Sequence, residues 1–238
     1  MEDASKAAVR DAVWTRFEEG DFARFPFPPR GRIPNFVGAE RAAERLFGTP
    51  EWKRAAVLKA NPDSPQRPVR KRALAAGKTV YMAVPRLRDE ECFVELDPAR
   101  IDDYDHASTI KGSSELGVRV GPDALPEIDL VVAGSVAVSE AGVRIGKGEG
   151  YSDLEYAILR ELGAVDDGTP LATTVHEAQV GDWDATADAH DVPLDLIATP
   201  GRVIRAASTD ATKPGGIDWG LLDDERVEEI PVLRRLRR

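Results

Sequence analysis

The stretch from residue 128 to residue 162 constrains the fold of this chain more than any other. An apolar run (IDLVVAGSVAV, 128–138) is followed by a glycine-containing segment (RIGKGEGYSD, 144–153) and then by an amphipathic pattern (DLEYAILREL, 153–162). The unbroken apolar run predicts a strand over 129–138 that is buried on both faces. The spacing of the apolar residues after it predicts a helix from residue 153. A buried strand followed by a helix is the repeating unit of a parallel α/β protein.

The rest of the chain continues this alternation. Helical patterns cover 3–18, 38–47, 65–76, 185–189 and 223–238, and strand patterns cover 54–60, 79–84, 171–175, 194–199 and 202–207. The proline-rich segment 25–31 predicts an extended connector, and the acidic segment 89–105 predicts an exposed strand and loop. We therefore expect a mostly parallel sheet with helices on both faces. Residues 1–212 would form one α/β domain, and 213–238 a linker followed by a short helical tail.

The amino-acid composition limits the kinds of binding partner and cellular setting that we expect for this protein. The net charge is −10, which gives no global attraction to nucleic acid. No apolar run reaches the roughly 18 residues of a membrane span, and Cys92 is the single cysteine, so a reducing, cytoplasmic setting without membrane contact is expected. The 24 arginines outnumber the 8 lysines, and the acids outnumber both together, which predicts a halophilic protein.

The segment 144–153 has the composition of a phosphate-binding loop. Its three glycines let backbone amides approach a ligand closely, and the helix that follows offers unpaired N–H groups and a partial positive charge. Arg144 and Lys147 add cationic donors, and Asp153 is a candidate metal ligand. The Rossmann and Walker spacings are both absent. A second interpretation stays open, in which Ser152 and Glu155 form a helix capping box and the glycines form only a turn.

The same segment resembles the nucleotide-binding motif of the 5-formyltetrahydrofolate cyclo-ligase (methenyltetrahydrofolate synthetase) family, R-[LI]-G-x-G-[GK]-G-Y-Y-D. The resemblance extends over most of the chain. KAAVR (6–10) is similar to the family's basic N-terminal helix, GKTVYMAVPR (77–86) to its G-K-x-V-x-x-P-R segment, and HDVPLDLIAT (190–199) to H-D-x-P-[VL]-D-x-I-[VA]-T. Asn61 to Asp63, Pro85 to Arg88 and the tail KPGGIDW (213–219) are similar to the branch of methenyltetrahydrofolate synthetase domain-containing proteins.

This resemblance implies a fold and a reaction. The fold would be three-layered, as in sugar-phosphate isomerases and CoA transferases. The reaction would be the ATP- and Mg²⁺-dependent cyclisation of 5-formyltetrahydrofolate to 5,10-methenyltetrahydrofolate. In it the formyl oxygen attacks the γ-phosphorus and nitrogen 10 then displaces phosphate, so catalysis is mostly positioning and charge neutralisation. No side-chain nucleophile is implied.

The resemblance also implies roles for particular residues. The nucleotide-binding set would be Lys6, Arg10, Arg144, Gly146, Lys147, Gly148, Gly150 and Tyr151. Asp153 would bind Mg²⁺. Asp63 aligns loosely with a family glutamate that engages the pterin of the folate substrate, and a surface turn over 61–65 explains the same residues equally well.

Two departures from the motif open an alternative function. Glu149 places an anion where the family has glycine or lysine, and Ser152 replaces the second tyrosine. A carboxylate about 4 Å from a bound phosphate costs roughly 4 kcal/mol at surface dielectric. This cost is avoided if Glu149 points to solvent or pairs with Lys147. The alternative is a non-catalytic module that binds nucleotide or folate. The basic end, 234–238, gives the only support for RNA association, and a solvated helix end explains it as well.

Overall fold

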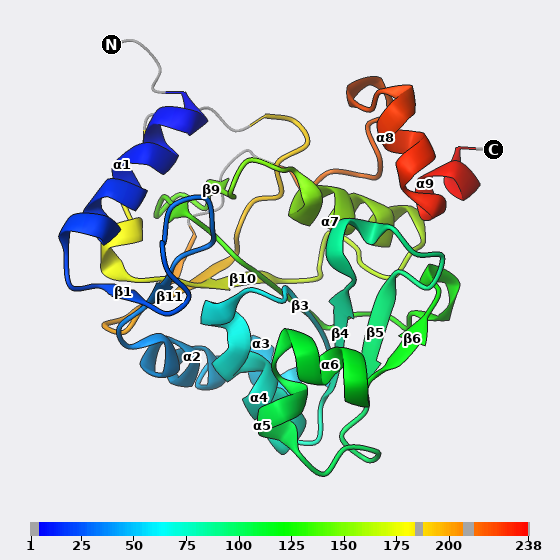
Figure 1. The fold of residues 1–238 in the computed structure, drawn as a ribbon, viewed down its shortest axis with the longest axis horizontal. Coiled ribbons are helices and arrows are strands. Elements are labelled where there is room, and N and C mark those ends of the chain that lie inside the picture. Colours follow the sequence, from blue (N-terminus) through cyan, green and yellow to red (C-terminus); the bar gives the residue numbers. More distant parts are fainter. Residues whose placement is uncertain (1–4, 184–187, 207–211, 238) are drawn as a thin grey trace.

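The computed structural model describes residues 5–183, 188–206 and 212–237, and Figure 1 shows their arrangement. An eight-stranded sheet in the order β12-β11-β10-β7-β3-β4-β5-β6 runs through the middle of the molecule. Its strands are β3 (Val57–Ala60), β4 (Thr79–Ala83), β5 (Phe93–Leu96), β6 (Val118–Val120), β7 (Leu130–Ala133), β10 (Leu171–Thr174), β11 (Leu196–Ala198) and β12 (Val203–Arg205). The five strands from β11 to β4 pair in parallel, and β12, β5 and β6 add antiparallel strands at the two edges. The predicted mostly parallel α/β class is confirmed.

Helices cover both faces of this sheet. The described helices are α1 (Lys6–Glu19), α2 (Ala39–Phe47), α3 (Pro50–Arg54), α4 (Arg67–Ala75), α5 (Tyr104–Ala107), α6 (Ile110–Leu116), α7 (Tyr151–Glu161), α8 (Asp224–Glu229) and α9 (Pro231–Leu236). In Figure 1, α7, α8 and α9 lie on one side of the strands, and α2, α4, α5 and α6 lie on the other. Two short hairpins, β1 (Ala23–Arg24) with β2 (Asn35–Phe36) and β8 (Ala137–Val138) with β9 (Arg144–Ile145), complete the structure.

The long strand predicted over 129–138 is wrong, because the apolar run covers two different strands. β7 ends at Ala133, and the chain leaves the sheet at Gly134. A side chain at position 134 would place its Cβ 2.6 Å from the Asp63 carboxylate, so any larger residue there would have to displace that group. The run then continues into β8; Val136 and Ala137 join a second apolar cluster with α1, and Val138 returns to the main core cluster. Both pieces are buried, which explains why the sequence shows no break.

The predicted capping box is also wrong. α7 begins at Tyr151, and its N-cap is Gly150 in the left-handed region (φ 69°), with no side-chain cap. Ser152 lies inside the helix, where its hydroxyl accepts a hydrogen bond from Asn61.

Other differences are smaller. The segment predicted to be exposed at 89–105 contains β5, whose Phe93 and Leu96 are fully buried. The helix predicted at 185–189 lies largely outside the described residues.

The C-terminal residues pack against the same core as the sheet. α8 and α9 replace the single predicted helix, since Pro231 starts a new one. Val227, Ile230, Val232 and Leu233 are buried members of the main apolar cluster, which also contains the residues of α7. The tail is therefore held in place by apolar burial, and this fixes the position of the side chains that α8 carries.

Candidate functional site

A cavity of about 400 Å³ lies at the carboxyl ends of β3, β4 and β7. Its walls come from the segments at the ends of these strands, 61–64, 83–86 and Gly134, and from residues 146, 147, 149 and 150 of the glycine loop (146–150) with the first turn of α7. Ligands in open α/β sheets bind at this edge, because the loops that follow parallel strands converge there. Most of the residues predicted for the site line this one cavity: Asp63, Arg144, Gly146, Lys147, Gly150, Tyr151 and Asp153.

The glycine loop has the backbone form that its sequence requires. Gly148 (φ 101°) and Gly150 (φ 69°) both adopt positive φ values, which cost a residue with a side chain about 1 kcal/mol or more. Gly150 directly precedes the N-terminus of α7, and residues 150–153 face the cavity. The first amides of this eleven-residue helix and its partial positive charge therefore lie at the cavity wall.

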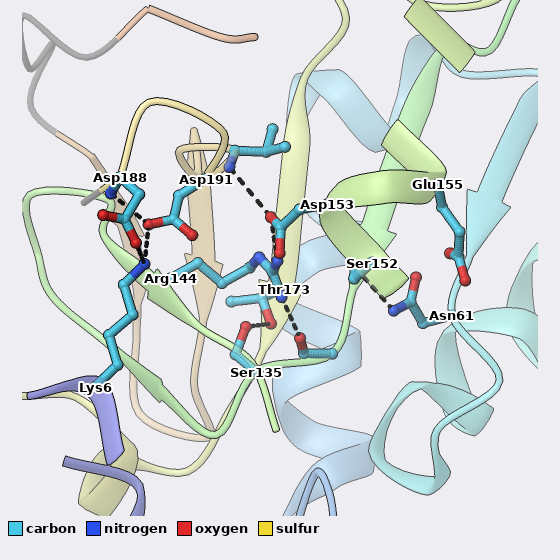
Figure 2. A network of polar contacts seen from close by, with 12 residues as sticks. Lys6, Asn61, Ser135, Arg144, Ser152, Asp153, Glu155, Thr173, Asp188 and Asp191 are labelled. Atoms are coloured by element: carbon cyan, nitrogen blue, oxygen red, sulfur yellow. Dashed lines mark hydrogen bonds and ion pairs between the residues drawn. The ribbon is translucent and has the colours of Figure 1, made fainter. Parts of the chain in front are cut away.

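Arg144 and Asp153 form a buried ion pair beside the loop, shown in Figure 2. Arg144 is 4% exposed; its Nη2 lies 2.5 Å from Asp153 Oδ1, and its Nη1 donates to the Gly134 carbonyl at 3.1 Å. Burial by itself lowers the pKa of Arg144, but Asp153, with Asp191 and Glu155, more than offsets that effect and the pKa is raised. Asp153 Oδ1 also accepts a hydrogen bond from the Val192 amide. Its Oδ2 accepts none from the described residues.

Lys147 and Glu149 pair with each other across Gly148. The distance from Lys147 Nζ to Glu149 Oε2 is 2.8 Å, and both side chains are partly exposed. Of the orientations that the sequence left open for Glu149, the structure shows pairing with Lys147. The anion therefore neutralises the one lysine of the loop.

The two cations of α1 have different surroundings. Lys6 contacts Asp188 at 2.6 Å and also pairs with Asp191, as Figure 2 shows. Arg10 lies against the glycine loop, since a Cβ at Gly148 would be 3.3 Å from its Cζ. Neither Lys6, Arg10 nor Gly148 is among the described residues that line the cavity. Arg10 is thus placed to reach a ligand held by the loop, whereas Lys6 is engaged by two carboxylates.

Asp63 presents its carboxyl group to the cavity next to Gly134. Burial in the cavity wall raises the pKa of Asp63 above its ordinary value, and the side chain accepts no hydrogen bond from any residue that the structure describes. A protonated carboxyl group both donates and accepts hydrogen bonds, whereas a carboxylate only accepts.

A buried polar cluster that the sequence did not predict lies under the cavity. Lys59 on β3 is 1% exposed, pairs with Glu155 of α7 and donates to Asn61 Oδ1 at 2.6 Å. Asn61 in turn donates to Ser152 Oγ at 3.2 Å, a contact visible in Figure 2. The signal was a single lysine inside the apolar strand pattern 54–60, together with a glutamate on the inner face of α7, far along the chain.

The backbone also carries an outlier at the cavity. Arg86, in the segment after β4, has φ 59°, and Leu87 has φ 54°. Such left-handed conformations in residues other than glycine concentrate at functional sites.

Two further groups of charged residues are compensated by ion pairs within the described part of the chain. Asp188, His190 and Asp191 have ligand atoms within 4.8 Å of one another, but the Lys6 ammonium already pairs with both aspartates. At the basic C-terminal end, Arg235 pairs with Asp123 and Arg237 with Asp224, which reduces the free positive charge of the described tail.

These features define a class: an α/β protein with a mostly parallel sheet and a cavity, lined in part by a glycine loop, at the carboxyl ends of its strands. The chain belongs to the 5-formyltetrahydrofolate cyclo-ligase family, whose model matches residues 24–200.

It is 45% identical over its whole length to the methenyltetrahydrofolate synthase domain-containing protein of Mus musculus and 41% identical over 98% of its length to that of Homo sapiens. The chain spans 64% and 61% of the length of these two relatives. The predicted family and branch are confirmed.

A solved structure supports the fold alone. The NMR structure of 5,10-methenyltetrahydrofolate synthetase from Aquifex aeolicus matches with a TM-score of 0.53 at 19% identity, covering 87% of this chain and 96% of that one. Among the described residues, no helix combines the length and the apolar character needed to cross a bilayer.

Proposed function

We propose that the chain binds Mg²⁺-ATP and 5-formyltetrahydrofolate in the cavity and catalyses cyclisation to 5,10-methenyltetrahydrofolate. The observation that carries this proposal is the convergence on one cavity of the glycine loop, the N-terminus of α7, Arg144 with Asp153, and Asp63. Family membership supports the proposed reaction class, and the convergence supports the proposal that these residues bind its substrates.

The residues fit a nucleotide with its metal. The amides at the start of α7 suit phosphate oxygens, and Arg10 lies against Gly148 of the same loop. Asp153 is held by Arg144 through Oδ1, so its other oxygen can serve as the single carboxylate ligand that Mg²⁺ commonly takes together with phosphate and water oxygens. Bound Mg²⁺ supplies neutralisation of phosphate charge.

The other side of the cavity fits a pterin. Asp63 lines this side and its side chain accepts no hydrogen bond from the described residues, so its carboxyl oxygens can accept from the N–H groups of a pterin ring. Ile33, Val84 and Ile110 supply apolar surface around it. The residues of the chain thus orient two substrates, and the reacting oxygen and nitrogen come from the folate itself.

The test is a turnover assay. The protein is incubated with 5-formyltetrahydrofolate and Mg²⁺-ATP at low and at molar KCl, and the methenyl absorbance is followed in the ultraviolet. We expect ATP-dependent product, loss of turnover in Asp153→Asn, and none of that loss in Glu140→Gln, a control in an exposed ion pair with Arg202. Folded wild-type protein without turnover at either salt concentration would refute the proposal.

A second candidate function is a module that binds nucleotide or folate without turnover. It is favoured by the ion pairs that the lysines of the site form with carboxylates. Lys147 is paired with Glu149 and Lys6 with Asp188 and Asp191, so two of the groups assigned to phosphate are neutralised. Calorimetry separates the two functions, because this candidate requires nucleotide or folate binding in a protein that forms no product.

A further inference from the structure

Arg226 joins the C-terminal tail to the glycine loop. It lies on α8, outside the residues matched by the family model, and donates from Nη2 to the backbone carbonyl of Glu149 at 2.9 Å. Its guanidinium also stacks over the ring of Tyr151, with Cζ 4.5 Å from the ring centroid. One planar cation therefore contacts the loop on both sides of Gly150.

A helix cap and apolar contacts hold the segment of the tail that carries Arg226. Asp223 caps α8 by accepting from the Arg226 amide at 2.7 Å. The neighbouring Val227 is 2% exposed, and it belongs to the same apolar cluster as the buried face of α7. Figure 1 shows α8 and α9 on the same side of the sheet as α7. Arg226 is thus anchored to the core independently of the loop that it contacts.

The contact with the Glu149 carbonyl fixes the next peptide group. In a trans peptide the C=O of residue 149 and the N–H of residue 150 point in opposite directions. With the carbonyl turned to Arg226, the Gly150 N–H points away from α8, and it donates to no residue in the described part of the chain. Gly150 lines the cavity, so this amide is kept available for a ligand.

We propose that Arg226 is a positioning residue that holds the glycine loop, and with it the Gly150 amide and the Tyr151 ring, in the form that receives the phosphates of a nucleotide. The identity of the ligand in this inference rests on the proposed function, whereas the contact between the tail and the loop does not depend on it. It assigns a role in the site to a segment beyond the matched family region.

Two measurements on the full chain test the inference. Hydrogen exchange of peptides covering 146–152 measures how well the loop backbone is protected when no ligand is present. Calorimetry with Mg²⁺-ATP measures the nucleotide affinity of the site. The variants are Arg226→Ala, Arg226→Lys and Arg237→Ala; the last is a matched control in the same helix pair, with an exposed ion pair to Asp224.

In Arg226→Ala we expect faster exchange of the loop and nucleotide affinity about tenfold weaker, from the loss of one charged hydrogen bond and one cation–π contact. Lysine keeps the charge but not the planar fork, so Arg226→Lys should recover only part of both effects. Arg237→Ala should match the wild type.

The outcomes separate the two proposals. Loop exchange in Arg226→Ala that equals the exchange in Arg237→Ala would overturn the inference. So would unchanged nucleotide affinity beside faster exchange. If the wild type binds no nucleotide, the proposed function fails and the ligand part of the inference with it. Faster exchange in Arg226→Ala would then support the contact alone.

Discussion

Replacing Lys59 by methionine should destabilise the protein strongly, although the new side chain is apolar and similar in length. Lys59 is 1% exposed and Glu155 is 7% exposed. The substitution leaves a buried carboxylate without its cation and Asn61 Oδ1 without a donor. Removing one partner of a buried ion pair costs about 3–5 kcal/mol. For a domain of this size each kcal/mol lowers Tm by about 2–4 °C, so we expect a decrease of roughly 6–20 °C.

Urea unfolding followed by tryptophan fluorescence measures this change. The double variant Lys59→Met/Glu155→Leu should recover most of the lost free energy of unfolding, because it removes the unpaired charge as well. Lys111→Met is the control: Lys111 is exposed and pairs with Glu115 one helical turn away, so its loss should cost at most about 0.5 kcal/mol. A Lys59→Met variant within about 1 kcal/mol of the wild type, or a double variant no more stable than the single one, would refute the reasoning.

Three further predictions concern the loop, the cavity and the surface. Glu149→Gln frees Lys147 and should strengthen Mg²⁺-ATP binding about fivefold by calorimetry, the scale of an exposed pair; unchanged affinity would show that Lys147 does not contact the nucleotide. Burial raises the pKa of Asp63, so its contribution to stability is present below the unfolded value of about 4 and is lost as pH rises through the folded value.

Asp63→Asn should therefore gain stability relative to the wild type as pH rises, which unfolding curves between about pH 4 and 8 would reveal; a constant difference would contradict it. The net charge of −10 predicts a Tm that rises from low salt to molar KCl, and a flat Tm would remove the halophilic interpretation.

The sequence predicted best those elements that bury a continuous apolar face. β3, β4, β10, β11 and β12 lie inside predicted strand segments, and α2 coincides with a predicted helix. The failures have local causes. β6 is a short edge strand with exposed residues, and β9 has only two residues. α6 contains Gly112 because its backbone passes so close to His106 that a Cβ would be 1.9 Å from the His106 carbonyl oxygen. Glycine and serine inside a short helix weaken its pattern.

The candidate site divides in a similar way. The loop residues were predictable because the glycines, Arg144 and Asp153 are neighbours in the sequence. Lys59 and Glu155 are 96 positions apart, and Arg226 contacts a residue 77 positions away. Such pairs become visible only when the sheet brings α7 over β3 and the tail over α7. Residues that are neighbours in the sequence thus indicated the loop that lines the cavity. Contacts between distant segments determine how the charges around it are compensated.

The buried pair of Arg144 and Asp153 has a consequence for how this family changes over time. Removing either partner of a buried ion pair costs about 3–5 kcal/mol, so each of these residues contributes to stability through the other, whether or not a metal ion binds. A lineage that loses the reaction would still be selected to keep both residues, together with the glycine whose carbonyl Arg144 contacts. The presence of this part of the motif is therefore explained by stability alone. If the reaction were lost, we expect the first substitutions at the exposed positions of the loop.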